Sequence, residues 1–115
     1  MNGGLIDHRG ALEAIERILN RGGHADDVLR AVLAALHERG VAFGAVRFVE
    51  NGELVDGPSV GDTAAGIDAP VAYEGRRIGS LTLAVDDLDF VARVATLISP
   101  YVLVGSDPGG ERWAP

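Results

Sequence analysis

The chain contains no cysteine and no lysine. Without cysteine it can form no disulfide bond and has no thiol of its own for catalysis. All ten basic residues are arginine, and 17 aspartates and glutamates outnumber them, so that the formal net charge is −7. A chain of this charge is repelled by nucleic acids and by anionic membrane surfaces, and we expect neither as a partner.

Long apolar runs and targeting segments are also missing from the sequence. No run approaches the roughly 20 apolar residues of a transmembrane helix, and the first residues lack the basic and apolar regions of a signal peptide. The hydrophobic share of 47% suits a globular chain, and 115 residues form one core rather than two. We expect one cytoplasmic domain over residues 11–105, between a flexible lead-in at 1–10 and a flexible tail at 106–115.

Three stretches carry apolar residues at three- and four-residue steps, which predicts amphipathic helices. The first covers residues 11–20 and ends at Gly22-Gly23, and the second runs from about residue 25 to residue 39. The third starts at the acidic cluster of residues 86–89, which suits a helix N-terminus. Pro100 interrupts this last helix because it removes one backbone donor.

The apolar period changes to two between the second and third helices, as it does in strands. Residues 43–50 and 53–56 flank Asn51-Gly52, the strongest short signal for a hairpin. A second hairpin covers residues 70–85 around Glu74-Gly75, and residues 57–67 are expected to form a loop. This order predicts an α+β fold of two layers, with an antiparallel four-stranded sheet and the helices packed on one face.

These segments together resemble GAF domains, the small sensory modules of signalling proteins. The resemblance rests on the hairpin from Phe48 to Leu54, on a proline-led strand followed by Arg77-Ile78-Gly79-x-Leu-x-Leu, and on the spacing of Phe90, Val94 and Leu97 in the last helix. It implies the GAF/PAS-like form of the α+β fold. It also implies a sensory or regulatory function without enzymatic activity, in a module that binds a small ligand or dimerises.

The sequence departs from this family between its two hairpins. GAF domains usually place further helices and a strand there, which roof the ligand pocket, whereas here residues 57–67 alone fill the interval. The cysteine that attaches bilins and the cysteines of the family's sulfoxide reductases are missing, and the lysine-containing cyclic-nucleotide motif cannot occur. The ligands known in the family therefore do not transfer to this chain, and we expect no cofactor.

No set of residues in the sequence suggests catalysis or metal binding. A nucleophile, a base and an orienting group cannot be assembled from the sequence order. The spacing of His8, His24 and His37 matches no metal motif. The aspartates at residues 86–89 suit helix capping better than calcium binding. The sequence therefore predicts that the chain is not an enzyme and has no metal site.

One polar cluster is a candidate ligand site. The simplest register of the second hairpin pairs Tyr73 with Arg76 and puts Tyr73 on the side of Ser80 and Thr82. Arg47 of the first strand falls on the same side. Together these five side chains could hold a small anion such as a carboxylate. Alternatively, they form the ordinary solvated face of an antiparallel sheet.

The last helix carries two apolar stripes, although a helix on a sheet needs only one. A second copy that buried the other stripe would give a homodimer through the first and last helices, whereas the first helix of the same chain could also cover it. The predicted interface consists of Leu12, Ile15, Phe90, Val94, Leu97 and Tyr101. The alternative to the ligand-binding module is thus a pure protein-interaction domain without a ligand pocket.

Overall fold

The computed structural model describes residues 7–105. Residues 1–6 and 106–115, which make up most of the expected lead-in and the whole expected tail, lie outside the described part. In chain order the elements are α1 (His8–Arg21), α2 (Ala25–Glu38), β1 (Phe43–Glu50), β2 (Glu53–Gly61), β3 (Ile67–Tyr73), β4 (Arg76–Leu83) and α3 (Leu88–Gly105). No helix among the described residues is long and apolar enough to cross a lipid bilayer.

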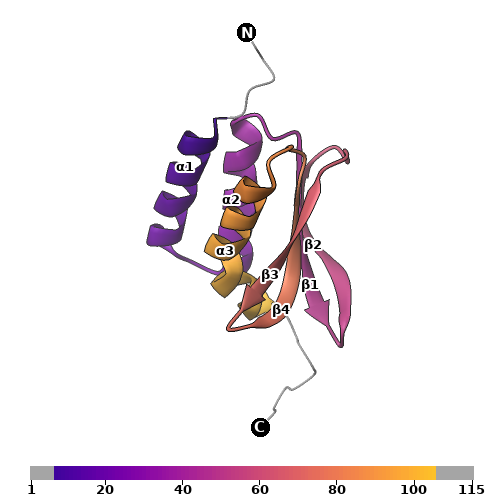
Figure 1. Cartoon of the computed structure of the whole chain (residues 1–115). Coiled ribbons are helices and arrows are strands. Elements are labelled where there is room, and N and C mark those ends of the chain that lie inside the picture. Colours follow the sequence, from indigo (N-terminus) through magenta and orange to yellow (C-terminus); the bar gives the residue numbers. More distant parts are fainter. Residues whose placement is uncertain (1–6, 106–115) are drawn as a thin grey trace.

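The strands form one antiparallel sheet of four in the order β2-β1-β4-β3, so that β1 and β4 are its central strands. Helix α2 packs against β1 and β2, and helix α3 packs against β3 and β4 on the same face of the sheet (Figure 1). Helix α1 lies outside this layer, against α2. The predicted α+β fold, with helices on one face of an antiparallel four-stranded sheet, is therefore confirmed.

The core lies between the sheet and the two helices that cover it. Strand residues at alternate positions, such as Val46 and Leu81, are fully buried there together with Leu33 and Ile98 of the helices. Because this inner face takes the apolar side chains, the polar residues of the central strands lie on the outer face. We call this outer surface of the sheet the open face.

Helix α1 begins earlier than the sequence predicts. The Asp7 side chain accepts a hydrogen bond from the backbone N–H of Gly10 at 3.0 Å and caps the helix, which starts at His8. The expected flexible lead-in is therefore wrong for residues 7–10. A cap of this kind satisfies a backbone donor that a helix start otherwise leaves unpaired, and it outweighs the flexibility suggested by the nearby glycines.

Both predicted hairpin turns are present. Asn51 and Gly52 have φ angles of 53° and 83°, and Glu74 and Gly75 have φ angles of 52° and 81°. Two consecutive positive φ angles are typical of the tight turns that match the twist of two-residue hairpins. Glycine adopts this conformation without strain, whereas Glu74 does so at a cost.

Strand β2 is longer than predicted. It continues to Gly61, so the expected loop over residues 57–67 is wrong for residues 57–61 and for Ile67, which starts β3, and the connection spans residues 62–66. Gly57 and Pro58 suggest a break, yet here they lie in an edge strand where β2 has one residue more than β1. Proline is tolerated in edge strands and at bulges because no ladder bond from its nitrogen is required there.

The register between β3 and β4 also differs from the simplest one. Tyr73 lies opposite Arg76 as predicted, but a bulge follows, so that Val71 lies opposite Gly79 instead of Ile78. In an unbroken strand Ile78 and Leu81 would point to opposite faces, because side chains alternate. Both are fully buried. The bulge adds the residue that lets both apolar side chains enter the core.

Candidate functional site

The open face brings together polar residues from three strands. In the register of the central strands Arg47 lies opposite Ser80, and Ala45 lies opposite Thr82. Strand β3 places Asp68 on the other side of Thr82. Residues that face each other across antiparallel strands share one side of the sheet, so Arg47, Thr82 and Asp68 lie on the open face.

A hollow of about 410 Å³ lies on the open face around Arg47, Asp68 and Thr82. Its volume is within the size range of small-molecule sites. The central strands line its middle, and β2, β3 and the connection between them surround it. The lining of the hollow includes Phe43, Arg47, Asp56, Ser59, Asp68 and Thr82.

The positive charge of the hollow belongs to Arg47. Its Nε lies 3.6 Å from Oδ1 of Asp56, and the two side chains are 47% and 94% exposed. An ion pair of this exposure contributes at most about 1 kcal/mol. The guanidinium carries five N–H donors in a fork that fits a carboxylate. A ligand carboxylate can therefore compete with Asp56 for Arg47.

The negative end of the hollow belongs to Asp68. The Thr82 hydroxyl donates a hydrogen bond to Oδ1 of Asp68, which fixes the carboxylate against the central strand β4. Within residues 7–105 the other carboxylate oxygen has no hydrogen bond, and the residue is exposed. An ionised carboxylate accepts hydrogen bonds only, so this oxygen can receive an ammonium group from a ligand.

Two of the five predicted site residues line the hollow, and three do not. Arg47 and Thr82 do. Ser80 shares their face but is only 3% exposed and does not line the hollow. The assignment of Tyr73 and Arg76 is wrong, because the bulge turns Tyr73 to the inner face, where it packs against the core, and Arg76 is its partner beside the turn.

The sequence-based prediction missed Asp56, Ser59 and Asp68. It ended β2 at Asp56 and began β3 at Pro70, so these residues fell at strand ends or in a loop. Ile67, Ala69 and Val71 alternate with Asp68 and Pro70, so a strand started at Ile67 with its apolar side chains turned inward would have placed Asp68 on the open face. Within residues 7–105 no group of three acidic or histidine side chains gathers in a way that could hold a metal ion.

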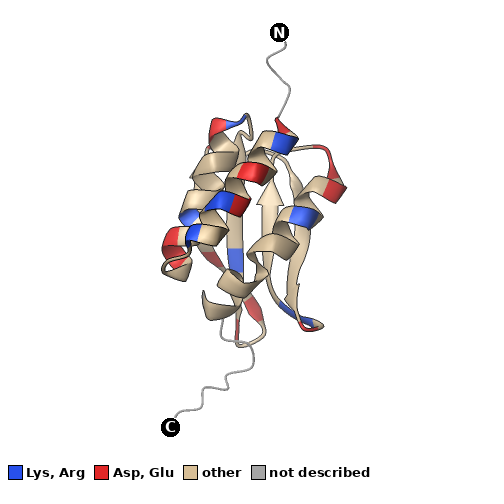
Figure 2. Cartoon of the chain, turned by 90° about the vertical axis from the view of Figure 1, so that its left-hand side faces the viewer, with Lys and Arg blue, Asp and Glu red and all other residues tan. Residues whose placement is uncertain are grey.

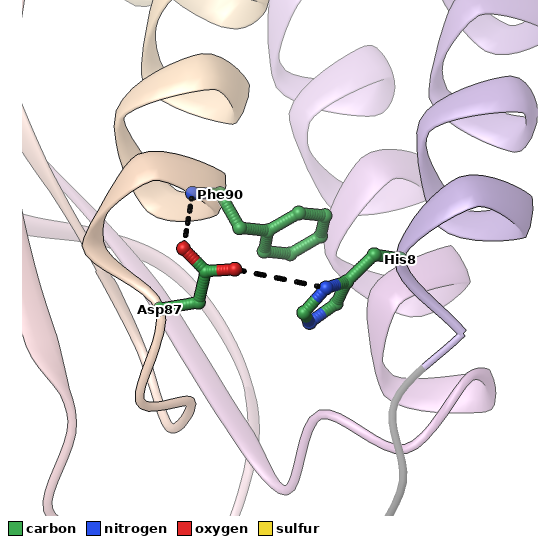
Figure 3. Close-up of polar contacts among 3 residues, drawn as sticks. All are labelled: His8, Asp87 and Phe90. Atoms are coloured by element: carbon green, nitrogen blue, oxygen red, sulfur yellow. Dashed lines mark hydrogen bonds and ion pairs between the residues drawn. The ribbon is translucent and has the colours of Figure 1, made fainter.

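The structure changes the prediction of the dimer interface. Ile15, Phe90 and Val94 are at most 5% exposed within the single chain, so a second copy cannot reach them in this fold. Leu12, Leu97 and Tyr101 are partly buried and pack against the core. Acidic and basic residues are interspersed along the helices (Figure 2). Helix α1 contacts α3 through the His8–Phe90 stack (Figure 3) and through the Tyr101 hydroxyl, which donates to the carbonyl oxygen of Leu19. The homodimer itself stays a prediction.

Taken together, the antiparallel sheet, the helices on one face and the hollow on the other define a GAF-like fold. The GAF domain of a phosphoenolpyruvate-protein phosphotransferase from Acinetobacter superposes with a TM-score of 0.64, at 12% identity, over 82% of this chain and 93% of that domain. No protein-family model and no curated protein sequence matches this chain. At this identity the likeness establishes the fold alone.

Enzymes share the same fold. The fRMsr of Staphylococcus aureus, in complex with its substrate, has a TM-score of 0.74 at 12% identity, covering 89% of this chain and 99% of the enzyme. A free methionine-R-sulfoxide reductase from Neisseria meningitidis, also bound to its substrate, has a TM-score of 0.71 at 17% identity, covering 85% of this chain and 90% of the enzyme.

These structures contradict the prediction of a non-enzymatic sensory module. Four of the similar structures are reductases of this type, so the GAF-like fold gives no reason to exclude enzymatic activity or to assign a signalling role. The alternative of a pure interaction domain is contradicted by the same comparison, because these four structures are of enzymes.

Proposed function

We propose that the open face binds a free amino acid as a zwitterion, with its carboxylate at Arg47 and its ammonium group at Asp68. The observation that carries the proposal is the placement of one guanidinium and two carboxylates around a single hollow. Reductases of free methionine sulfoxide, itself an amino acid, have the same fold. Free methionine sulfoxide is therefore the first ligand to test.

The charges favour a zwitterion over the simple anion expected from the sequence. Arg47 is accompanied in the hollow by Asp56 and Asp68, so the site as a whole is negative. An anion would be attracted by Arg47 and repelled by both carboxylates, whereas a zwitterion finds an opposite charge at each end. The ring of Phe43 lines the same hollow and offers an apolar surface to the ligand's side chain.

Recognition is the step that the residues of this chain support. Reduction of a sulfoxide by thiols takes two electrons from cysteine side chains, and this chain contains no cysteine. We therefore assign the chain the binding of the amino acid and derive no reductase step from its own residues.

Isothermal titration calorimetry with L-methionine sulfoxide tests the proposal directly. The N-acetyl derivative lacks the ammonium charge and the methyl ester lacks the carboxylate, so we expect each to bind at least tenfold more weakly than the free amino acid. Each step of ten corresponds to about 1.4 kcal/mol. Equal binding of all three molecules, or no binding of any free amino acid in a panel of the common ones, would refute the proposal.

Two variants assign the charges to residues. Arg47→Gln should weaken binding of the free amino acid about tenfold, and Asp68→Asn should have a similar effect, because each removes one charge-assisted contact. Arg76→Gln is the matched control, since Arg76 lies beside the hairpin turn and away from the hollow. A loss with Arg76→Gln as large as that with Arg47→Gln would contradict the assignment.

A further inference from the structure

Strand β2 carries a bulge that turns Asp56 toward the hollow. Arg47 lies opposite Asp56 and Ala45 lies opposite Ser59, so two steps along β1 correspond to three steps along β2. In a regular strand Asp56 and Ser59 would point to opposite faces, because side chains alternate. The extra residue at Gly57-Pro58 lets both of them line the hollow.

Gly57 is the residue that permits this bulge. A Cβ at its position would collide with the ring of Phe48 and would lie 2.8 Å from the carbonyl oxygen of Val46. Glycine is typical of bulges where another backbone approaches so closely. The backbone that carries Asp56 is therefore held beside β1, whereas the Asp56 side chain is 94% exposed and can turn in solvent.

The ion pair between Asp56 and Arg47 is a loose one. Its separation of 3.6 Å exceeds that of a hydrogen bond, and no hydrogen bond joins the Arg47 side chain to any residue within 7–105. A carboxylate that binds a guanidinium in the bidentate mode uses two parallel N–H donors. A ligand carboxylate can thus make contacts with Arg47 that Asp56 does not make, but it has to displace the Asp56 side chain first.

We propose that Asp56 is an internal competitor for Arg47 and thereby sets the specificity of the hollow for zwitterions. The inference rests on the proposed binding of free amino acids. A simple carboxylate that binds Arg47 breaks its pair with Asp56 and then lies beside the displaced side chain, which has the same charge. A free amino acid meets the same cost at its carboxylate, but its ammonium group gains an opposite charge at Asp68. Removal of the Asp56 charge should therefore strengthen binding.

Two ligands that differ only in the ammonium group test the inference. They are L-methionine sulfoxide and its desamino analogue, 4-(methylsulfinyl)butanoate, titrated into the natural chain and into Asp56→Asn. Chemical shifts in NMR spectra follow the binding of both, including the weak binding of the analogue. We expect Asp56→Asn to bind methionine sulfoxide about threefold more tightly than the natural chain does, the size of an exposed ion pair. The analogue should gain about tenfold, because the lost repulsion was not offset by an ammonium contact.

Glu53→Gln is the matched control for the change in charge. Glu53 lies on the same strand, is exposed and does not line the hollow, so both affinities should stay as in the natural chain. An equal gain with Glu53→Gln would assign the effect to the overall charge and overturn the inference.

The remaining outcomes separate this inference from the proposed function. Unchanged or weaker binding of methionine sulfoxide by Asp56→Asn, with binding by the natural chain intact, would overturn the role of Asp56 alone. Weaker binding would assign Asp56 to the ammonium group of the ligand. No binding of any free amino acid by the natural chain would refute the proposed function and this inference together.

Discussion

The close approach of β1 and β4 at Gly79 allows a sharp test of the sheet. A Cβ at residue 79 would lie 2.3 Å from the carbonyl oxygen of Arg47 and 2.8 Å from Cγ1 of Val102. Both distances are too short for a real Cβ, so both neighbours would have to move. Val102 can change its side-chain conformation. The Arg47 oxygen belongs to the backbone of a central strand and can move only with that strand.

We expect Gly79→Ala to lower the free energy of unfolding by about 3 kcal/mol, the upper part of the range for an extra carbon atom in a packed core. The upper part applies because the nearer obstacle is backbone. Urea denaturation followed by far-UV circular dichroism measures the change from the midpoint and slope of the transition. A loss below about 1 kcal/mol, under the usual range for overpacking, would refute the reasoning.

Two further variants show whether the cost comes from the strand. Gly52→Ala adds a Cβ with nothing within 4 Å but at a φ of 83°, so it should cost only about 1 kcal/mol of backbone strain. Val102→Ala in the Gly79→Ala background removes the side-chain clash alone, so the loss in the double variant should be smaller than the sum of the two single losses but should not vanish. Full compensation would mean that the Arg47 backbone is not the obstacle.

Two further predictions concern α1 and the assembly. Asp7→Ala should lower the free energy of unfolding by about 1 kcal/mol through loss of the cap, while Asp7→Asn should not; equal stability of all three chains in urea denaturation would contradict the cap. Leu97 and Tyr101 are only partly buried and Val104 is 73% exposed on α3, so the homodimer is still expected. Sedimentation equilibrium at micromolar concentration should give twice the chain mass of 12.0 kDa, and Leu97→Glu should give 12.0 kDa. A mass of 12.0 kDa for the natural chain would refute the homodimer.

The elements with an unbroken period could be predicted from the sequence. Strand β1 has the predicted bounds because its alternation is regular and Asn51-Gly52 ends it. Helix α2 agrees to within one residue at its end. In both cases the local pattern and the tertiary burial require the same residues to face the core, so reading the pattern was sufficient.

The register of the second hairpin could not be predicted in this way. Ile78 and Leu81 lie three positions apart, so they point to opposite faces in a regular strand and to the same face if a bulge lies between them, and the sequence is compatible with both. Only the demand of the core for both side chains selects the bulge. The residues of the candidate site show the same contrast between regular and irregular strand segments. Arg47 and Thr82 lie on regular parts of central strands and were found, whereas Asp56 and Asp68 lie where β2 and β3 were cut short.

The two prolines at the borders of the sheet have a consequence for its neighbours in solution. Strands β2 and β3 are the outer strands, and each contains one proline, Pro58 and Pro70. The outer row of amides that could pair with a strand from another molecule is therefore interrupted on both sides, because proline has no N–H to donate. Sheets whose edge strands are interrupted by proline resist edge-to-edge pairing and the growth of fibrils. This chain should remain dispersed even with a sheet face that no helix covers.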